Sequence, residues 1–233
     1  MLGVNKAYML NNILKIPKMI FSFSNPITDI YKNNTQQGNI SNDIKSEKIF
    51  LPPKEMRFNM NQPSALYNMA SNLRNIVDSA RGGGHEVIIL CIGTDRSTGD
   101  ALGPLTGTKL KSINLHPDVY GTLDDPVHAT NLEGKIKFIN NNYESPFIIA
   151  VDACLGRIEN IGWFALGSGA VKPGTAVNKN LPEVGDAYIT GTVNVGGFME
   201  HMVLQSTRLN LVVKMAETIA HGLSFALGRK NIN

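Results

Sequence analysis

The sequence predicts an α/β domain, a three-layer sandwich in which a twisted, mostly parallel sheet of about five strands lies between helices. From Pro63 onward, short apolar runs rich in Val and Ile alternate with segments of helical periodicity. Such alternation favours parallel strands, because each intervening helix returns the chain to the same end of the sheet. Two of the apolar runs, 86–93 and 146–152, break into polar turns that contain an aspartate.

The composition predicts one large globular domain preceded by a tail. The chain has 233 residues, of which 42% are hydrophobic and 18% are charged, which suits one domain better than two. Residues 1–60 are rich in Asn, Lys, Ser and Ile and lack sustained periodicity, so we expect a poorly ordered tail. Simple disorder, folding on a partner and regulation of access to a site are all compatible with such a tail. Residues 61–233 are expected to form a single α/β domain.

Charge and apolar patterning restrict the partners and the location. A formal net charge of +3 is too weak to predict direct nucleic-acid binding. The apolar stretch 19–24 is interrupted by Pro17 and Lys18 on one side and by Pro26 on the other, and it is too short to span a membrane. We therefore expect a cytoplasmic protein without a membrane partner.

A helix, a strand and a second helix open the domain. Ser64 is the expected N-cap of the first helix, and the glycines at 82–84 end it. The apolar residues that share its face are Leu66, Met69, Leu73, Ile76 and Val77. Strand 86–93 follows, then a glycine-rich loop, and then a helix over 101–113 with the acidic Asp100 near its positive end.

The middle and the last third continue this alternation. We expect a short strand over 119–123, a helix over 131–141 and a strand over 146–152. Strands over 161–166 and 186–190 come next. They flank a long loop, 167–185, and a loop of this length in a small domain is more often functional, so we expect it to border the cleft.

The C-terminal segment 206–227 has the strongest helical pattern in the chain, with Ser206 as its expected cap and Gly228 as its terminator. Packing on the sheet is the expected role of its apolar face, and binding of a partner is the alternative.

Asp100 and Asp152 are the candidate catalytic residues. Both stand where an apolar strand gives way to a turn, and the carboxyl ends of strands in an open α/β sheet form the usual ligand crevice. A carboxylate pair can share a proton, so that one member acts as general base and the other as general acid. The same pair could instead hold a divalent metal, with His201 as the best third ligand.

Structural roles compete with each of these assignments. Asp100 can simply cap its helix, Asp152 can bond turn amides, and His201 can lie at the surface. Cys91 and Cys154 are predicted to be small buried hydrophobic residues. Cys154 follows Asp152 by two residues, and the positive charge of Arg157 could lower the pKa of its thiol, so a nucleophilic role is the alternative.

The loop 93–99 lacks the motifs of a P-loop or a dinucleotide site, yet its backbone amides could bind an anion or an oxyanion. A phosphorylase-like or other small-molecule enzyme is therefore a further hypothesis.

Three motifs carry a family resemblance. The segment from Gly93 to Pro104, Ala-Val-Asp152-Ala, and the run from Val171 to Lys179 resemble in order and spacing the bacterial spore germination protease. From about residue 62 to 228 the chain more closely resembles the YyaC family of sporulation proteins, which are grouped with that protease. The resemblance implies a phosphorylase/hydrolase-like fold, shared with the HybD-like hydrogenase maturation endopeptidases.

The resemblance also implies roles for the candidate residues. The two essential acids of the germination protease correspond to Asp100 and Asp152. In the maturation endopeptidases equivalent acids bind nickel together with a histidine, so nickel or zinc is the expected metal if one is bound, and His201 lies in about the right region.

From the residues and the resemblance together, we expect a sporulation-associated endopeptidase of the developing spore that uses Asp100 and Asp152 to activate water. Small acid-soluble spore proteins are the expected substrates, and the loop 172–183 is expected to position them. The alternative is a non-catalytic peptide-binding or spore-assembly protein on the same fold.

Overall fold

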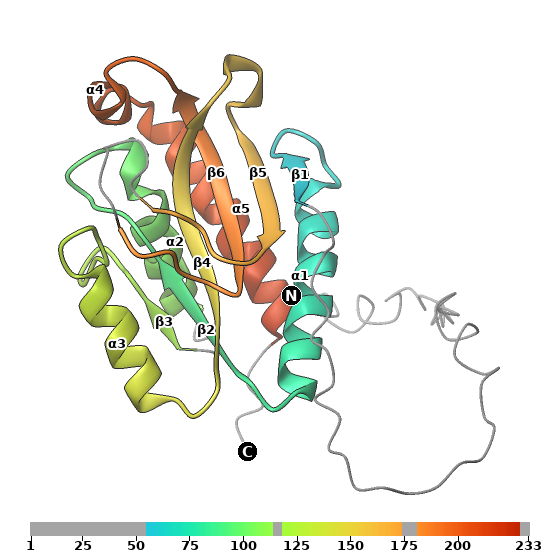
Figure 1. Ribbon diagram of the computed structural model, residues 1–233. Helices are drawn as coiled ribbons and strands as arrows, with labels where there is room; N and C mark the ends of the chain where they lie inside the picture. Colours follow the sequence, from blue (N-terminus) through green and yellow to red (C-terminus); the bar gives the residue numbers. More distant parts are fainter. Residues whose placement is uncertain (1–54, 114–117, 174–180, 229–233) are drawn as a thin grey trace, which may run out of the picture. The chain divides into compact units, whose positions relative to one another are not determined.

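A six-stranded mixed sheet forms the centre of the computed structural model, which describes residues 55–113, 118–173 and 181–228 (Figure 1). The strands are β1 (Met56–Asn59), β2 (Glu86–Cys91), β3 (Val119–Tyr120), β4 (Pro146–Gly156), β5 (Trp163–Ser168) and β6 (Ala187–Val195). Their order across the sheet is β1-β5-β6-β4-β2-β3. The four strands β3, β2, β4 and β6 are mutually parallel, whereas β5 and β1 are antiparallel to their neighbours. The predicted α/β class with a mostly parallel sheet is confirmed.

Helices cover both faces of this sheet. They are α1 (Ala65–Gly82), α2 (Leu102–Ser112), α3 (Leu132–Asn142), α4 (Glu200–Gln205) and α5 (Leu209–Leu227), with the 3-10 turns η1 (Gly99–Ala101) and η2 (Ile158–Asn160). One core joins α1, α2 and α5 to side chains such as Ile89 and Ile189, and a smaller core joins α3 to Leu90 and Ala150 on the opposite face. The expected three layers are present, and the layer that contains α3 is the thinner one.

The sheet has one strand more than expected because β1 lies inside the segment assigned to the tail. Residues 56–59 pair antiparallel with β5, with Met56 opposite Leu166 and Asn59 opposite Trp163. A strand of four residues is too short to produce a recognisable alternation in the sequence. The domain boundary predicted at residue 60 is therefore too late. Residues 1–54 of the expected tail lie outside the described residues.

The start of the C-terminal helix also differs from the prediction. α5 begins at Leu209 with Arg208 as its N-cap, whereas Ser206 is the residue that ends α4. The six residues of α4 are too few to show helical periodicity, so the sequence pattern merged the two helices. No helix in the described part of the chain is long and apolar enough to cross a membrane.

Candidate active site

Direct backbone hydrogen bonds hold three chain segments together at the carboxyl edge of the sheet. The N–H of Ile92 donates to the carbonyl of Val151 at 2.7 Å, and the N–H of Gly93 donates to the carbonyl of Val127 at 2.8 Å. Ile92 thus lies between the segments that lead to Asp152 and to His128. The loop that carries Asp100 leaves from the same point, so residues far apart in the sequence reach one edge.

Asp152 lies inside β4, which continues to Gly156, whereas the sequence predicted that the strand ends there. The pairing of β4 with β2 stops at Cys91 and Val151, while the pairing with β6 continues through Asp152 and Thr190. Asp152 is therefore the first residue of β4 without β2 beside it. The position at which β2 ends opens the sheet next to this carboxyl group.

Two glycines let the loop that carries Asp100 lie close to β2. A Cβ on Gly93, whose φ is +141°, would lie 1.9 Å from the carbonyl oxygen of Asp100. A Cβ on Gly103 would lie 2.1 Å from the carbonyl oxygen of Ile92. The N–H of Thr94 donates to the Asp100 carbonyl at 3.1 Å and closes the loop. Only glycine tolerates these approaches, so the spacing of the glycines fixes where Asp100 stands.

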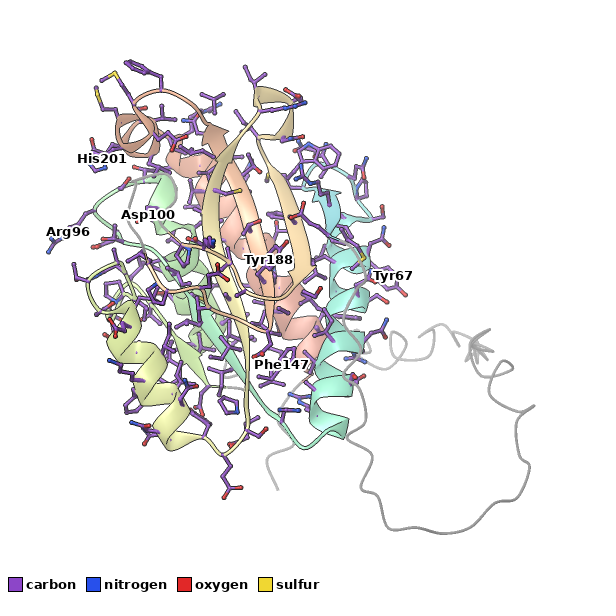
Figure 2. The ribbon with its side chains drawn as sticks, viewed as in Figure 1. Tyr67, Arg96, Asp100, Phe147, Tyr188 and His201 are labelled. Carbon is purple, nitrogen blue, oxygen red and sulfur yellow. The ribbon has the colours of Figure 1, made fainter. Side chains whose placement is uncertain are left out.

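Asp100 and Asp152 line one cavity of about 1070 Å³. His128, Cys154 and His201 contribute to the same wall. Figure 2 shows Asp100, Arg96 and His201 at one end of the molecule, the end toward which β6 points. The structure therefore brings together the two carboxylates that the sequence placed at separate strand ends.

The carboxyl group of Asp152 is in a setting that favours its protonated form. Its side chain is only 6% exposed, and burial raises its pKa well above the ordinary value. The negative charge of Asp100 raises the pKa further, while a hydrogen bond from the Ala153 N–H to Oδ1, 2.8 Å long, opposes both effects. Because burial and the neighbouring acid are the larger causes, the net effect raises the pKa of Asp152 and favours its protonated form.

Asp100 lies in a more exposed setting than Asp152. It belongs to η1, directly before α2, and is less buried than Asp152. The positive end of a helix dipole stabilises a nearby negative charge. The two acids therefore have different environments, since Asp152 is buried and Asp100 lies at the start of a helix.

The donors present do not fit a three-ligand metal site. Within residues 55–113, 118–173 and 181–228, no three His, Cys, Asp or Glu side chains are grouped so that they could hold a metal ion. His201 lies exposed on α4, where its Nε2 is 3.2 Å from the Nε2 of Gln205. It lines the cavity of Asp100 and Asp152 but does not complete a ligand set with them. We derive no step through a metal.

Several loop amides that were expected to bind an oxyanion already have partners. The N–H groups of Gly93 and Thr94 donate to backbone carbonyls, and the N–H of Arg96 donates to Thr94 Oγ1. These three amides do not supply the expected donors. On the same loop, the Ser97 hydroxyl is buried and has no hydrogen-bond partner in the described part of the chain.

Cys154 is not an activated nucleophile. Burial raises the pKa of its thiol, and the charges of Asp152 and Glu55 add to that rise, whereas hydrogen bonds with Thr192 and Thr190 oppose it. Arg157, the residue expected to lower this pKa, is exposed and forms an ion pair with Glu159. The thiol form is therefore favoured, and thiolate chemistry at this position is disfavoured.

We expect Cys154 to be alkylated by iodoacetamide at pH 7.5 at least about tenfold more slowly than an exposed thiol, because the thiolate is the reacting form. Mass spectrometry of timed samples measures the rate, and a Ser112→Cys variant provides the exposed reference thiol on α2. Equal rates at the two positions would contradict the structure.

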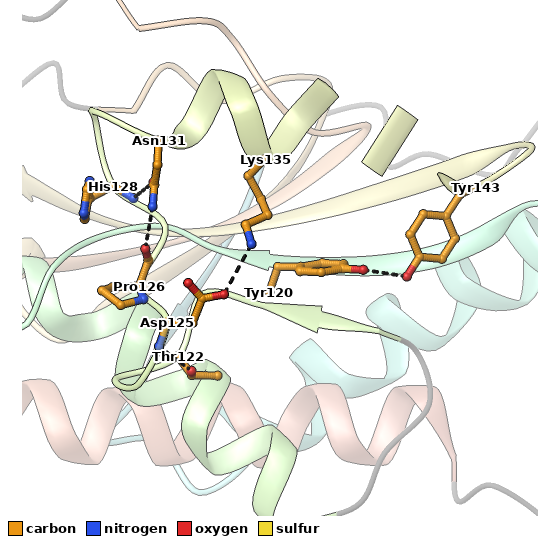
Figure 3. Close-up of polar contacts among 8 residues, drawn as sticks. All are labelled: Tyr120, Thr122, Asp125, Pro126, His128, Asn131, Lys135 and Tyr143. Carbon is orange, nitrogen blue, oxygen red and sulfur yellow. Dashed lines mark hydrogen bonds and ion pairs between the residues drawn. The ribbon is translucent and has the colours of Figure 1, made fainter. Parts of the chain in front are cut away.

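His128 is a cavity residue that sequence reasoning missed, since it belongs to no spaced ligand motif. Its ring Nδ1 lies 2.9 Å from Thr130 Oγ1 and accepts a hydrogen bond from the Thr130 N–H at 3.4 Å. The side chain of Asn131 holds the backbone on both sides of Val127. The His128 N–H donates to Asn131 Oδ1, and Asn131 Nδ2 donates to the Pro126 carbonyl (Figure 3). The only sequence signal for His128 is the polar turn that follows the predicted strand 119–123.

Apolar side chains also line the cavity. Met199 and Met202 line it, and Phe198 beside them is 84% exposed. Met199 has a positive φ of 51°, a conformation that is uncommon for a residue other than glycine. Pro173 and Leu181 line the cavity from the long loop, which confirms that this loop borders the cleft. Residues 174–180, the centre of that loop, lie outside the described residues.

Comparison with known proteins gave three findings. A family described as "Protein of unknown function (DUF1256)" matches residues 57–222. A protein of Bacillus subtilis (strain 168), described as "Uncharacterized protein YyaC", is 55% identical over 158 residues, which are 66% of this chain and 77% of that protein. A crystal structure of the NiFe hydrogenase maturation protease HycI from Thermococcus kodakarensis KOD1 is 21% identical, covers 59% of this chain and 92% of that one, and has a TM-score of 0.34.

Proposed function

The chain belongs to the DUF1256 family, together with YyaC of Bacillus subtilis, and from the carboxyl pair in its cavity we propose that it is an endopeptidase. The predicted kinship with the YyaC family is confirmed. The kinship with the spore germination protease stays a prediction, and so do a role in sporulation and a location in the cytoplasm of the developing spore.

The observation that carries the proposal is the presence of two acids in one cavity, one of which is buried so that its protonated form is favoured. Burial and the charge of Asp100 raise the pKa of Asp152, so that Asp152 can act as a proton donor and Asp100 as a proton acceptor within one cavity. Hydrolysis of an amide needs both, a base to activate water and an acid to protonate the leaving nitrogen. A residue that only caps a turn needs neither the burial nor the charged neighbour.

The hydrolysis balances with these two groups. Asp100 takes a proton from water while the water oxygen bonds to the carbonyl carbon of the scissile peptide. Asp152 then gives its proton to the amide nitrogen as the carbon–nitrogen bond breaks, which releases an amine and a carboxylic acid. A proton passes from Asp100 back to Asp152 and restores the starting state.

The shape and lining of the cavity support a peptide substrate. A volume of about 1070 Å³ exceeds what most small-molecule sites offer. The apolar border that contains Met199 and Met202 suits side chains on either side of a scissile bond, because methionine adapts to varied apolar partners. We propose small acid-soluble spore proteins as substrates on the resemblance alone.

Cleavage of a proteome-derived peptide library and of small acid-soluble spore proteins, followed by mass spectrometry, tests the proposal. The unmodified chain should make discrete fragments, and Asp100→Asn and Asp152→Asn should each lower the rate by about 10²- to 10⁴-fold. Asp124→Asn, a change at an exposed loop acid, is the control and should cleave at the wild-type rate.

The pH profile adds a second check. The rate should fall as pH rises through the raised pKa of Asp152, because the acid then loses the proton that it must donate. Absence of cleavage by the unmodified chain, with peptide binding retained in both Asn variants, would defeat the endopeptidase proposal in favour of the non-catalytic peptide-binding protein.

A further inference from the structure

We propose that His128 is a third catalytic residue, whose Nε2–H donates a hydrogen bond to the carbonyl oxygen of the scissile peptide as negative charge develops there. This inference rests on the proposed endopeptidase function. The attack of water on an amide moves negative charge onto the carbonyl oxygen, and neither Asp100 nor Asp152 stabilises that charge in the proposed mechanism. A donor placed at that oxygen lowers the barrier.

The loop next to Asp100 does not readily supply this donor. The N–H groups of Gly93, Thr94 and Arg96 are all hydrogen-bonded within the protein. The Ala153 N–H is likewise committed to Asp152 Oδ1. These four amides are therefore not the donors, whereas His128 lies on the cavity wall with Asp100 and Asp152 and carries a side-chain N–H that could act in their place.

The hydrogen bonds of the ring determine which nitrogen carries the proton. A backbone N–H can only donate, so the bond from the Thr130 N–H requires Nδ1 of His128 to be an acceptor. In this tautomer the proton is on Nε2. Within the described residues, no protein group bonds this second nitrogen, which remains available to a bound molecule.

The backbone of His128 is held from both sides. Its N–H donates to Asn131 Oδ1 at 2.8 Å, and its carbonyl accepts from the N–H groups of Asn131 and Leu132 at 3.1 and 2.9 Å. The preceding residue, Val127, pairs with Ile92 at the end of β2. These bonds extend the sheet to His128 and restrict the motion of the residue, which is the preorganisation that charge stabilisation needs.

The turn before His128 is tied down as well. Lys135 on α3 bonds Asp125 at 3.3 Å, and the Asp125 N–H donates to Thr122 Oγ1 at 3.1 Å (Figure 3). His128 therefore lies in a loop, between the sheet and the start of α3, that this ion pair and this hydrogen bond stabilise.

Kinetics on the best-cleaved library peptide test the catalytic role. His128→Ala should lower kcat by about 10²- to 10³-fold with KM changed by less than about threefold, because the lost bond is made to the charge of the transition state. His128→Gln keeps an amide N–H donor and should recover activity to within about tenfold of wild type. His221→Ala, an exposed histidine on α5, is the matched control and should behave like wild type.

A second measurement does not depend on turnover. Nitrogen-15 NMR of the imidazole rings in the intact chain, with His128→Gln used to assign the signals, should show a protonated Nε2 and an unprotonated Nδ1 in His128. The opposite tautomer would overturn the inference.

The outcomes separate this inference from the proposed function. If Asp152→Asn is inactive while His128→Ala keeps the wild-type kcat, the endopeptidase stands and the role of His128 falls. The role falls equally if His201→Ala, and not His128→Ala, carries the loss in kcat. If the unmodified chain cleaves no peptide, the proposed function fails and the inference that rests on it fails with it.

Discussion

Asp152→Asn is expected to remove peptidase activity and at the same time to stabilise the folded domain at pH 8. The buried carboxyl group prefers to be protonated, because burial and the charge of Asp100 oppose its ionisation. Asparagine is uncharged at every pH, and its amide oxygen can still accept the Ala153 N–H that now bonds Oδ1 at 2.8 Å. The substitution thus removes an electrostatic cost along with the catalytic proton.

The sign of the pH dependence follows from proton linkage. A carboxyl group with a raised pKa in the folded state binds more protons folded than unfolded, so the wild type loses stability as pH rises from the unfolded pKa, near 3.8, toward the folded pKa. Each unit of that difference costs about 1.4 kcal/mol, or roughly 3 to 6 °C in Tm for a domain of this size. The Asp152→Asn variant should not show this loss of stability as pH rises.

Thermal unfolding at pH 5 and pH 8 measures the effect. The Tm advantage of Asp152→Asn over the wild type should be larger at pH 8 than at pH 5. Asp78→Asn, a change at an exposed acid on α1, should show no such widening. If the difference in Tm between the variant and the wild type is the same at both pH values, the raised pKa of Asp152 is contradicted.

Gly93→Ala is expected to destabilise the domain by about 2 to 4 kcal/mol, because backbone strain and overpacking each cost about 1 to 3 kcal/mol. The added Cβ would lie 1.9 Å from the Asp100 carbonyl oxygen and 3.1 Å from Pro104 Cδ. The backbone at φ +141° is also unfavourable for any residue with a side chain. Relief of this clash would displace the carboxylate of Asp100, so activity should fall more than the loss of stability alone explains.

Gly82→Ala is the matched control, since a Cβ there meets nothing within 4 Å at the end of α1. It should leave Tm unchanged or raise it slightly, because alanine favours helix and restricts the unfolded chain. Urea unfolding midpoints for the two variants and the wild type measure the difference. Equal midpoints for Gly93→Ala and Gly82→Ala would show that the close approach of the loop to β2 is not needed.

The fold class was accessible from the sequence because it depends on local pattern. α1 lies where the apolar spacing predicted it, and Met69, Leu73 and Ile76 are fully buried. β2, β4 and α3 likewise fall within a few residues of their predicted spans, apart from the extension of β4 to Gly156. Periodicity reports which face of an element is apolar, and that property is retained in any fold that buries this face.

Elements without a pattern of their own were missed. β1 is held only by its pairing with β5, more than a hundred residues later in the chain. α4 is too short to show periodicity, and the end of β4 is set by β6 beside it. For these segments the partner in space, which the local sequence does not name, decides the conformation.

The sequence by itself determined the α/β class, most of the helices and strands, and the choice of Asp100 and Asp152 as the acids of the candidate site. Only the tertiary structure decided which side chains share the cavity. It brought His128 to the cavity wall through the pairing of Val127 with Ile92. Among the residues that the structure describes, it placed His201 in no group of three possible metal ligands, and it used the amides of Gly93, Thr94 and Arg96 for hydrogen bonds within the protein. It also raised the pKa of Asp152, because that shift depends on burial and on a charge supplied by another segment of the chain. Burial and long-range pairing are properties of the folded chain, and no local pattern encodes them.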